Sequence, residues 1–160
     1  MTNSKQTKVG SILDEVTEGI IIQQVNAQGV MGSGFAKAIR DKWPKVWEEY
    51  SKEVLPNQPD KGLDYLGCVI YVQVDEKLWV ANLVGQQFYG RDKGQVYTLY
   101  PAVARGLHSI SNFAQNKDLD VHYPPIGCGL ASGDWTIVSW LLDVHLVKIN
   151  HSLWLQEQGS

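Results

Sequence analysis

The sequence reads VNAQGVMGSG at residues 25–34, between the apolar run GIII at 19–22 and the segment FAKAIR at 35–40. This order predicts a buried strand, a glycine-rich loop and the start of a helix. The first N–H groups of a helix have no partner within it, and glycine lets a ligand approach the main chain because it has no Cβ. Together with the helix dipole, these N–H groups favour an anion or a phosphorylated sugar.

A second glycine-rich stretch has the same arrangement later in the chain. It reads PPIGCGLASGDW at residues 124–135, after a short strand expected at 120–123 and before a helix expected at 134–147. Ligands of open α/β sheets bind beyond the carboxyl ends of the strands. Since both loops leave strands at such ends, we expect them to face one ligand from opposite sides of a single crevice.

Strands and helices alternate along most of the chain, which predicts a single three-layer α/β domain over residues 1–160. The continuous β-branched run at 20–25 is typical of a strand buried on both faces. Apolar residues at helical spacing, and proline in a first turn, indicate the helices. We expect strands at 8–13 (with the turn that follows), 20–25, 66–74, 78–84, 120–123 and 152–156. We expect helices at 34–43, 44–54, 98–115 and 134–147, and a loop at 56–62.

Composition is that of an ordinary globular protein. Of 160 residues, 44% are hydrophobic and 19% are charged. No apolar run approaches the roughly 20 residues of a membrane span, and the N-terminal residues lack the apolar core of a signal peptide. We therefore expect no membrane partner and a cytoplasmic location, or a nuclear one in a eukaryote. The net charge of −3 argues against a broad nucleic-acid-binding face, and we expect a monomer.

General catalytic and metal motifs are absent from the sequence. Neither glycine loop fits the dinucleotide or P-loop pattern, and neither HExxH nor GxSxG occurs. The two cysteines, Cys68 and Cys128, form neither a disulfide framework nor a zinc signature and are interpreted as buried reduced thiols. We expect His122 to pack in the core near the second loop, and the histidines His108, His145 and His151 to be structural or solvated. No metal site and no cofactor are expected.

A polar segment with two aromatic residues, GQQFYGRDKG, follows the strand expected at 78–84. Phe88 and Tyr89 either form a wall of a binding cleft or fold back onto the core. The basic residues Arg91 and Lys93 alternate with Asp92, so they do not form a basic patch.

The two glycine motifs, together with NLVGQ at 82–86, resemble the macrodomain family. More narrowly, they are similar to the phage-type and yeast-type ADP-ribose-1''-phosphate phosphatases, and the likeness spans nearly the whole chain. The resemblance implies a three-layer α/β/α fold with a central mixed sheet. It also implies ADP-ribose or ADP-ribose-1''-phosphate as the ligand.

The resemblance assigns roles to individual positions. Asn26 would hydrogen-bond the distal ribose as a catalytic residue, with an Asx turn that shapes the loop as the alternative. Ser11 and Ile12 would lie at the adenine, where many macrodomains have an aspartate. A sister subgroup that removes ADP-ribose from adducts uses a lysine at a position near Gln86 and an aspartate at the position of Ala131. This chain has neither residue at these positions. The remaining ligand-binding positions are Gly32, Ser33 and Gly34 near the distal ribose, and Gly127, Cys128, Gly129, Leu130, Ala131, Ser132 and Gly133 around the diphosphate.

Asp134 is the one carboxylate inside a motif. It would act as a general base or orient a water beside the terminal phosphate, or it would cap the following helix. Three functions remain open at this point. The first is hydrolysis of ADP-ribose-1''-phosphate to ADP-ribose and phosphate. The second is a reader that binds ADP-ribose without chemistry, and the third is a hydrolase of ADP-ribosyl adducts on protein or nucleic acid.

Overall fold

The computed structural model describes residues 4–56, 62–92 and 94–156. Six strands form one sheet: β1 (Lys5–Val9), β2 (Gly19–Asn26), β3 (Val69–Asp75), β4 (Leu78–Gln86), β5 (Val121–Tyr123) and β6 (His151–Leu155). The helices are α1 (Ile12–Glu15), α2 (Gly34–Lys42), α3 (Pro44–Val54), α4 (Tyr100–Lys117) and α5 (Trp135–His145), with a short 3-10 turn, η2 (Leu63–Tyr65). No helix within these described ranges has the length and apolar character that crossing a membrane requires.

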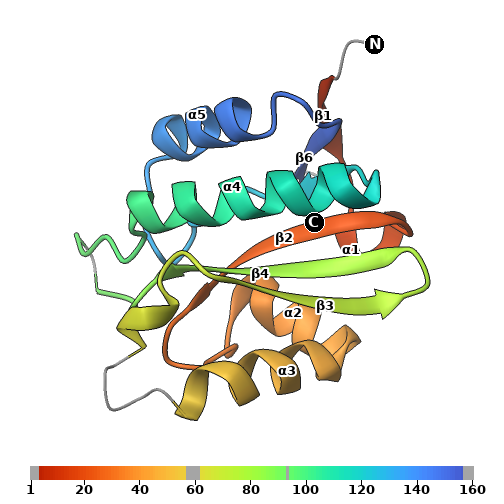
Figure 1. Ribbon diagram of the computed structural model, residues 1–160. Helices are drawn as coiled ribbons and strands as arrows, with labels where there is room; N and C mark the ends of the chain where they lie inside the picture. Colours follow the sequence, from red (N-terminus) through yellow and green to blue (C-terminus); the bar gives the residue numbers. More distant parts are fainter. Residues whose placement is uncertain (1–3, 57–61, 93, 157–160) are drawn as a thin grey trace.

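The sheet has the strand order β1-β6-β5-β2-β4-β3. All neighbouring strands are parallel except β3 and β4, which form an antiparallel hairpin. Figure 1 shows α4 and α5 on one face of the sheet and α2 and α3 on the other. This is the predicted three-layer arrangement with a central mixed sheet.

Strand β2 lies at the centre of the sheet and is almost completely buried. Ile20 and Ile22 pack with α4 and α5 in the larger apolar core. Ile21 and Val25 point to the opposite face, toward the side covered by α1, α2 and α3. The prediction of a strand covered on both faces is therefore confirmed.

The first strand is the main difference from the predicted elements. The expected strand and turn at 8–13 are replaced by β1, which ends at Val9, and by the four-residue helix α1. β1 is an exposed edge strand, so it lacks the buried alternation that reveals a strand. Within the predicted loop at 56–62, residues 57–61 lie outside the described part of the chain.

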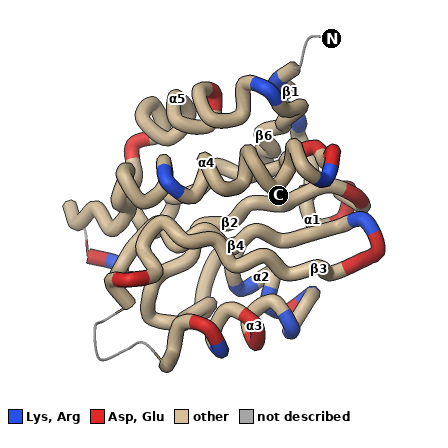
Figure 2. The backbone as a smooth tube through the Cα atoms, in the orientation of Figure 1, with Lys and Arg blue, Asp and Glu red and all other residues tan. Residues whose placement is uncertain are grey.

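Charged residues of both signs lie near one another along the backbone. Figure 2 shows Lys and Arg positions next to Asp and Glu positions on α3 and at the turns of the sheet. This mixture agrees with the interleaved charges of the sequence.

Candidate functional site

The two glycine loops meet at one end of the sheet. β2 and β5 are adjacent and parallel, so the loops that follow them leave the same edge. A cleft of about 600 Å³ lies between these loops. The predicted ligand-binding residues that line it are Asn26, Gly32, Ser33, Gly34, Gln86, Gly127, Gly129, Leu130 and Ala131.

A second hollow, of about 920 Å³, adjoins the cleft on the side of β1 and β6. Ser11 and Ile12 line it, together with the aromatic ring of Trp154. The two hollows share Phe35 and Pro124 in their linings, so they form parts of one groove across the strand ends. The predicted residues Cys128, Ser132, Gly133 and Asp134 line neither hollow.

The first loop presents unpaired N–H groups to the cleft. Helix α2 begins at Gly34, and the side chain of its N-cap residue, Ser33, makes no capping hydrogen bond. The first helical N–H with an acceptor is that of Lys37, which donates to the Ser33 carbonyl at 3.3 Å. Within the described residues, the N–H groups of Gly32, Ser33 and Gly34 have no acceptor. This is the arrangement of a helix start that binds an anion.

The side chain of Asn26 shapes the first loop. It is 7% exposed, and its Oδ1 accepts the N–H groups of Gln28 at 3.0 Å and Val30 at 3.3 Å. Its Nδ2 donates to the Val30 carbonyl at 2.9 Å. The expected alternative, an Asx turn, is therefore present. A carboxamide has two N–H bonds, so the second one on Nδ2 can still donate to a ligand.

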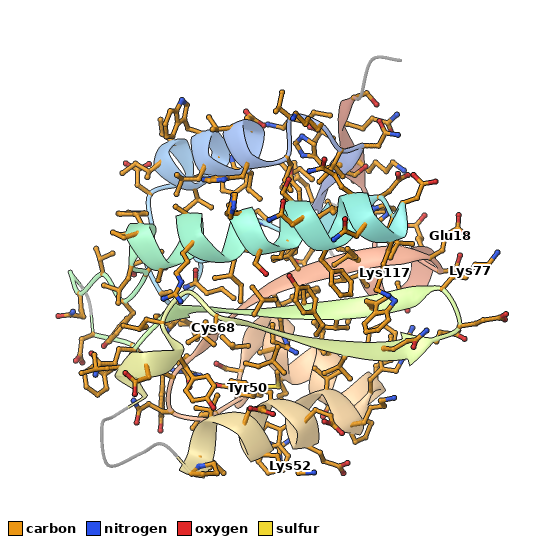
Figure 3. All side chains as sticks on the ribbon, viewed as in Figure 1. Glu18, Tyr50, Lys52, Cys68, Lys77 and Lys117 are labelled. Atoms are coloured by element: carbon orange, nitrogen blue, oxygen red, sulfur yellow. The ribbon has the colours of Figure 1, made fainter. Side chains whose placement is uncertain are left out.

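Tyr50 supports this turn from helix α3, and no sequence pattern identified it. Its hydroxyl donates to the Asn26 carbonyl and accepts the Gly29 N–H at 3.1 Å. The ring lies between α3 and the sheet, completely buried (Figure 3). Burial raises the pKa of Tyr50, so its hydroxyl stays protonated and holds the backbone of the turn.

The second loop carries a row of N–H groups without acceptors among the described residues. Its base is closed by two bonds, from Ser132 N–H to the Gly129 carbonyl at 3.0 Å and from Gly133 N–H to the Gly127 carbonyl at 2.7 Å. In the described part of the chain, the N–H groups from Gly127 to Ala131 have no acceptor. Consecutive free N–H groups of this kind form an anion-binding nest. The N–H groups of Ser132 and Gly133 hold the loop shape instead.

A buried polar network connects this nest to the sheet. The Nε2 of Gln24 donates to Gln86 Oε1 at 2.8 Å and to Thr98 Oγ1 at 2.9 Å. The Thr98 hydroxyl donates to the Gly127 carbonyl at 2.6 Å, and Gln86 Nε2 donates to the Phe88 carbonyl at 2.7 Å. Gln86 therefore helps to fix the position of the second loop as well as lining the cleft.

Asp134 has the geometry of a helix cap. Its Oδ1 accepts the Thr136 N–H at 2.9 Å at the start of α5, and its own N–H donates to the Tyr100 hydroxyl at 2.9 Å. Asp134 does not line the cleft. Its catalytic role stays a prediction.

The two cysteines are free, as expected, but they are only half-buried, which corrects the expectation of buried thiols. Cys68 follows a turn before β3, and Cys128 lies in the second glycine loop, so neither has the complete burial of a core position. Burial, and then the charge of Asp134, raise the pKa of Cys128 to about 11. Its thiol therefore stays protonated at neutral pH and is a poor nucleophile.

His122 lies on β5, half-buried, where its Nδ1 accepts the Trp154 Nε1–H at 3.1 Å. It does not line the cleft. The residues from 4 to 156 that the structure describes contain no group of three or more His, Cys, Asp or Glu placed to hold a metal.

The sequence left open whether Phe88 and Tyr89 form a wall of the cleft, and it identified neither Gly90 nor Arg91 as a ligand contact. Tyr89, one of the two aromatic residues of the polar segment, forms part of the cleft wall, whereas Phe88 does not. Gly90 and Arg91 line the cleft beside it. Among the described residues that line either hollow, Arg91 carries the only charge. Its basic character was visible in the sequence, but its direction into the cleft depends on long-range packing.

The fold and the paired glycine loops define a macrodomain-like α/β/α protein with a groove across its strand ends. A macrodomain protein from Streptomyces coelicolor is similar to this chain at a TM-score of 0.76 and 27% identity, over 96% of this chain and 100% of that one. A protein of unknown function from Bacteroides thetaiotaomicron is similar at a TM-score of 0.85 and 28% identity, over 97% and 99%.

A third solved structure, Thermosipho africanus DarTG in complex with ADP-ribose, is similar at a TM-score of 0.73 and 18% identity. That likeness covers 97% of this chain and 42% of DarTG. No protein-family model matches the sequence, and no curated protein matches it. These structural neighbours show that this chain has the macrodomain fold.

Proposed function

We propose that this protein binds ADP-ribose across the strand ends and hydrolyses ADP-ribose-1''-phosphate to ADP-ribose and phosphate. The observation that carries the proposal is the pair of unpartnered N–H rows, at Gly32–Gly34 and at Gly127–Ala131, on two sides of one cleft. Backbone N–H groups bind phosphate oxygens without bringing a titratable group. The complex of the structurally similar DarTG with ADP-ribose supports this ligand.

The groove suits an extended ligand with a diphosphate in the middle. β6 and β4 are three positions apart in the sheet, which is about 14 Å at the usual strand spacing. The diphosphate would lie over the nest, and the free N–H of Asn26 would donate to a hydroxyl of the distal ribose. The adenine would enter the second hollow, between Phe35 and Trp154, where Ser11 replaces the aspartate of many macrodomains.

For hydrolysis, a water oxygen would form a bond to the terminal phosphorus while the bond to the C1'' oxygen breaks. That oxygen leaves as the hydroxyl of ADP-ribose and takes up the proton that the attacking water loses. The N–H rows would stabilise negative charge on the phosphoryl oxygens in the transition state. No carboxylate, imidazole or thiol of the described residues lines the cleft, so we expect slow turnover.

The absence of acid–base groups from the described cleft lining also favours a second candidate, a reader that binds ADP-ribose without chemistry. The two candidates share the binding step and differ only in phosphate release. Titration calorimetry with ADP-ribose tests the shared step. We expect Asn26→Ala to weaken ADP-ribose binding at least 10-fold, because it removes both the ligand donor and the Asx turn.

Measurement of phosphate release from ADP-ribose-1''-phosphate tests the proposed hydrolase activity. Asp134→Asn is the decisive variant, because asparagine keeps the helix cap and removes the carboxylate. A general-base role predicts about 100-fold slower release with unchanged unfolding. A capping role predicts normal release for Asp134→Asn and about 1 kcal/mol lower stability for Asp134→Ala. Binding without any phosphate release by the wild type would leave the reader as the function.

A further inference from the structure

Arg91 has an unusual position in the groove. The two hollows are lined by backbone, apolar side chains and neutral amides, and Arg91 carries the one charge among their described lining residues. Its side chain is exposed, and it makes no ion pair with any described residue. An unpaired guanidinium in a groove without carboxylates favours an anionic ligand group nearby.

Tyr97 holds the segment that carries Arg91. On one side of Arg91, a Cβ added to Gly90 would overlap the Tyr97 hydroxyl, so the backbone packs directly against that ring. On the other side, the Tyr97 hydroxyl donates to Asp92 Oδ2 at 3.5 Å. The N–H of Tyr97 in turn donates to the Ala131 carbonyl of the second loop at 2.8 Å. Arg91 is therefore positioned relative to the anion-binding nest.

The order of the strands places Arg91 at a defined end of the groove. The segment with Arg91 follows β4, whereas Ser11 and Trp154 line the hollow on the side of β1 and β6. The nest, after β5, lies between these ends. A ligand with its diphosphate on the nest and its base at Trp154 therefore directs its distal sugar toward Arg91.

We infer that Arg91 binds a phosphate monoester on this distal sugar and so distinguishes the phosphorylated ligand from plain ADP-ribose. The inference rests on the proposed function. A guanidinium presents two parallel N–H donors that match two phosphate oxygens. Plain ADP-ribose has no charge at that end and gains little from Arg91.

The test compares two ligands on one pair of variants. For Arg91→Gln, we expect the Kd (or KM, where turnover occurs) of ADP-ribose-1''-phosphate to rise 10- to 100-fold, as about 1.5–3 kcal/mol for a charged hydrogen bond implies. The Kd of ADP-ribose should change less than 3-fold. Arg91→Lys should keep part of the affinity, because it keeps the charge and loses the paired donors. Salt should weaken wild-type binding of the phosphorylated ligand more than that of the Arg91→Gln variant.

Arg40→Gln is the matched control, because its guanidinium stacks on Trp47 at 4.2 Å and lines neither hollow. It should leave both ligands unaffected. An equal effect of Arg91→Gln on both ligands, or no effect on either, overturns the inference while leaving the proposed function intact. Failure of the wild type to bind ADP-ribose at all overturns the proposed function and the inference with it.

Discussion

Gly127 and Gly129 lie two residues apart in the second loop, yet a side chain would meet different surroundings at the two positions. Gly127 has a φ of +72°, and a Cβ there would lie 2.6 Å from Gln24 Oε1 and 3.0 Å from Thr98 Oγ1. At Gly129 no heavy atom lies within 4 Å of the added Cβ, and the backbone is not in the left-handed region. The first glycine is needed by the fold of the loop, and the second faces open space.

We therefore expect Gly127→Ala to lower the free energy of unfolding by about 1–3 kcal/mol, because it adds both backbone strain and a contact with the Gln24–Thr98 network. Gly129→Ala should leave stability within about 1 kcal/mol of wild type. It should still weaken ADP-ribose binding, since its methyl group would point into the ligand's space. Urea unfolding and calorimetry measure the two quantities separately. Equal destabilisation by both substitutions would contradict this account of the loop.

Among the elements, those with a buried face were predictable from the sequence, whereas the exposed edge strand β1 and the short helix α1 were not. β2, the β3–β4 hairpin and the helices α3, α4 and α5 lie within a few residues of their predicted positions, because apolar periodicity records burial. β1 carries Lys5 and Lys8 on an exposed edge, so its pairing with β6 leaves little pattern in the sequence. Helix α1 has only four residues, too few for a helical period.

The strands β5 and β6 are joined by a buried side-chain bond that should make stability depend on pH. The Tyr123 hydroxyl and His151 Nδ1 lie 2.6 Å apart, and His151 is 5% exposed. The Nδ1 of a neutral imidazole can accept a hydrogen bond from the hydroxyl there. Burial lowers the pKa of His151 below its usual 6.5; nearby Asp143 opposes this shift and Lys5 adds to it.

Below pH 6.5 the unfolded chain therefore binds a proton at His151 that the folded chain resists. The contribution of His151 to the free energy of unfolding is therefore fully present above about pH 7. It is lost as the pH drops through 6.5, by at most about 1.4 kcal/mol per pH unit for this group. Burial also lowers the pKa values of His122 and His145, which adds to the same slope.

Urea midpoints from pH 5 to pH 8 measure this dependence. We expect His151→Gln to reduce the slope below pH 6.5, because glutamine does not titrate. Ser152→Ala changes a buried neighbour on the same strand without removing a titratable group, and it should keep the wild-type slope. A His151→Gln variant with the full wild-type slope would show that His151 does not contribute.

At the scale of the whole molecule, the sequence was sufficient to predict that the two glycine loops lie together. Each motif is contiguous, and parallel neighbouring strands bring their carboxyl ends to one edge. The supporting residues could not be predicted in this way. Tyr50 reaches Asn26 from helix α3, and Arg91 lines the cleft from a segment that contacts Tyr97 at Gly90. Such contacts depend on side-chain directions between distant segments, which one sequence does not record.

The outer face of α5 carries an exposed apolar patch, and its size indicates whether the chain can form a stable dimer there. Ile137, Trp140 and Val144 lie on one side of the helix at spacings of three and four residues, and Val147 follows just beyond its end. These four side chains are between 39% and 67% exposed. Their exposed area is on the order of 400 Å², a size found for the largest apolar patch of many monomers. It is about half of the roughly 800 Å² that each partner contributes to a standard stable interface.

We therefore expect a mass near 17.9 kDa by sedimentation at micromolar concentration, with weak self-association at much higher concentration. Trp140→Lys should abolish that weak association, because it places a charge at the centre of the patch. It should leave the free energy of unfolding within about 0.5 kcal/mol of wild type, since an exposed side chain contributes little to the core. A stable dimer at micromolar concentration that Trp140→Lys dissociates would mean that neighbouring surface adds to the patch and completes an interface there.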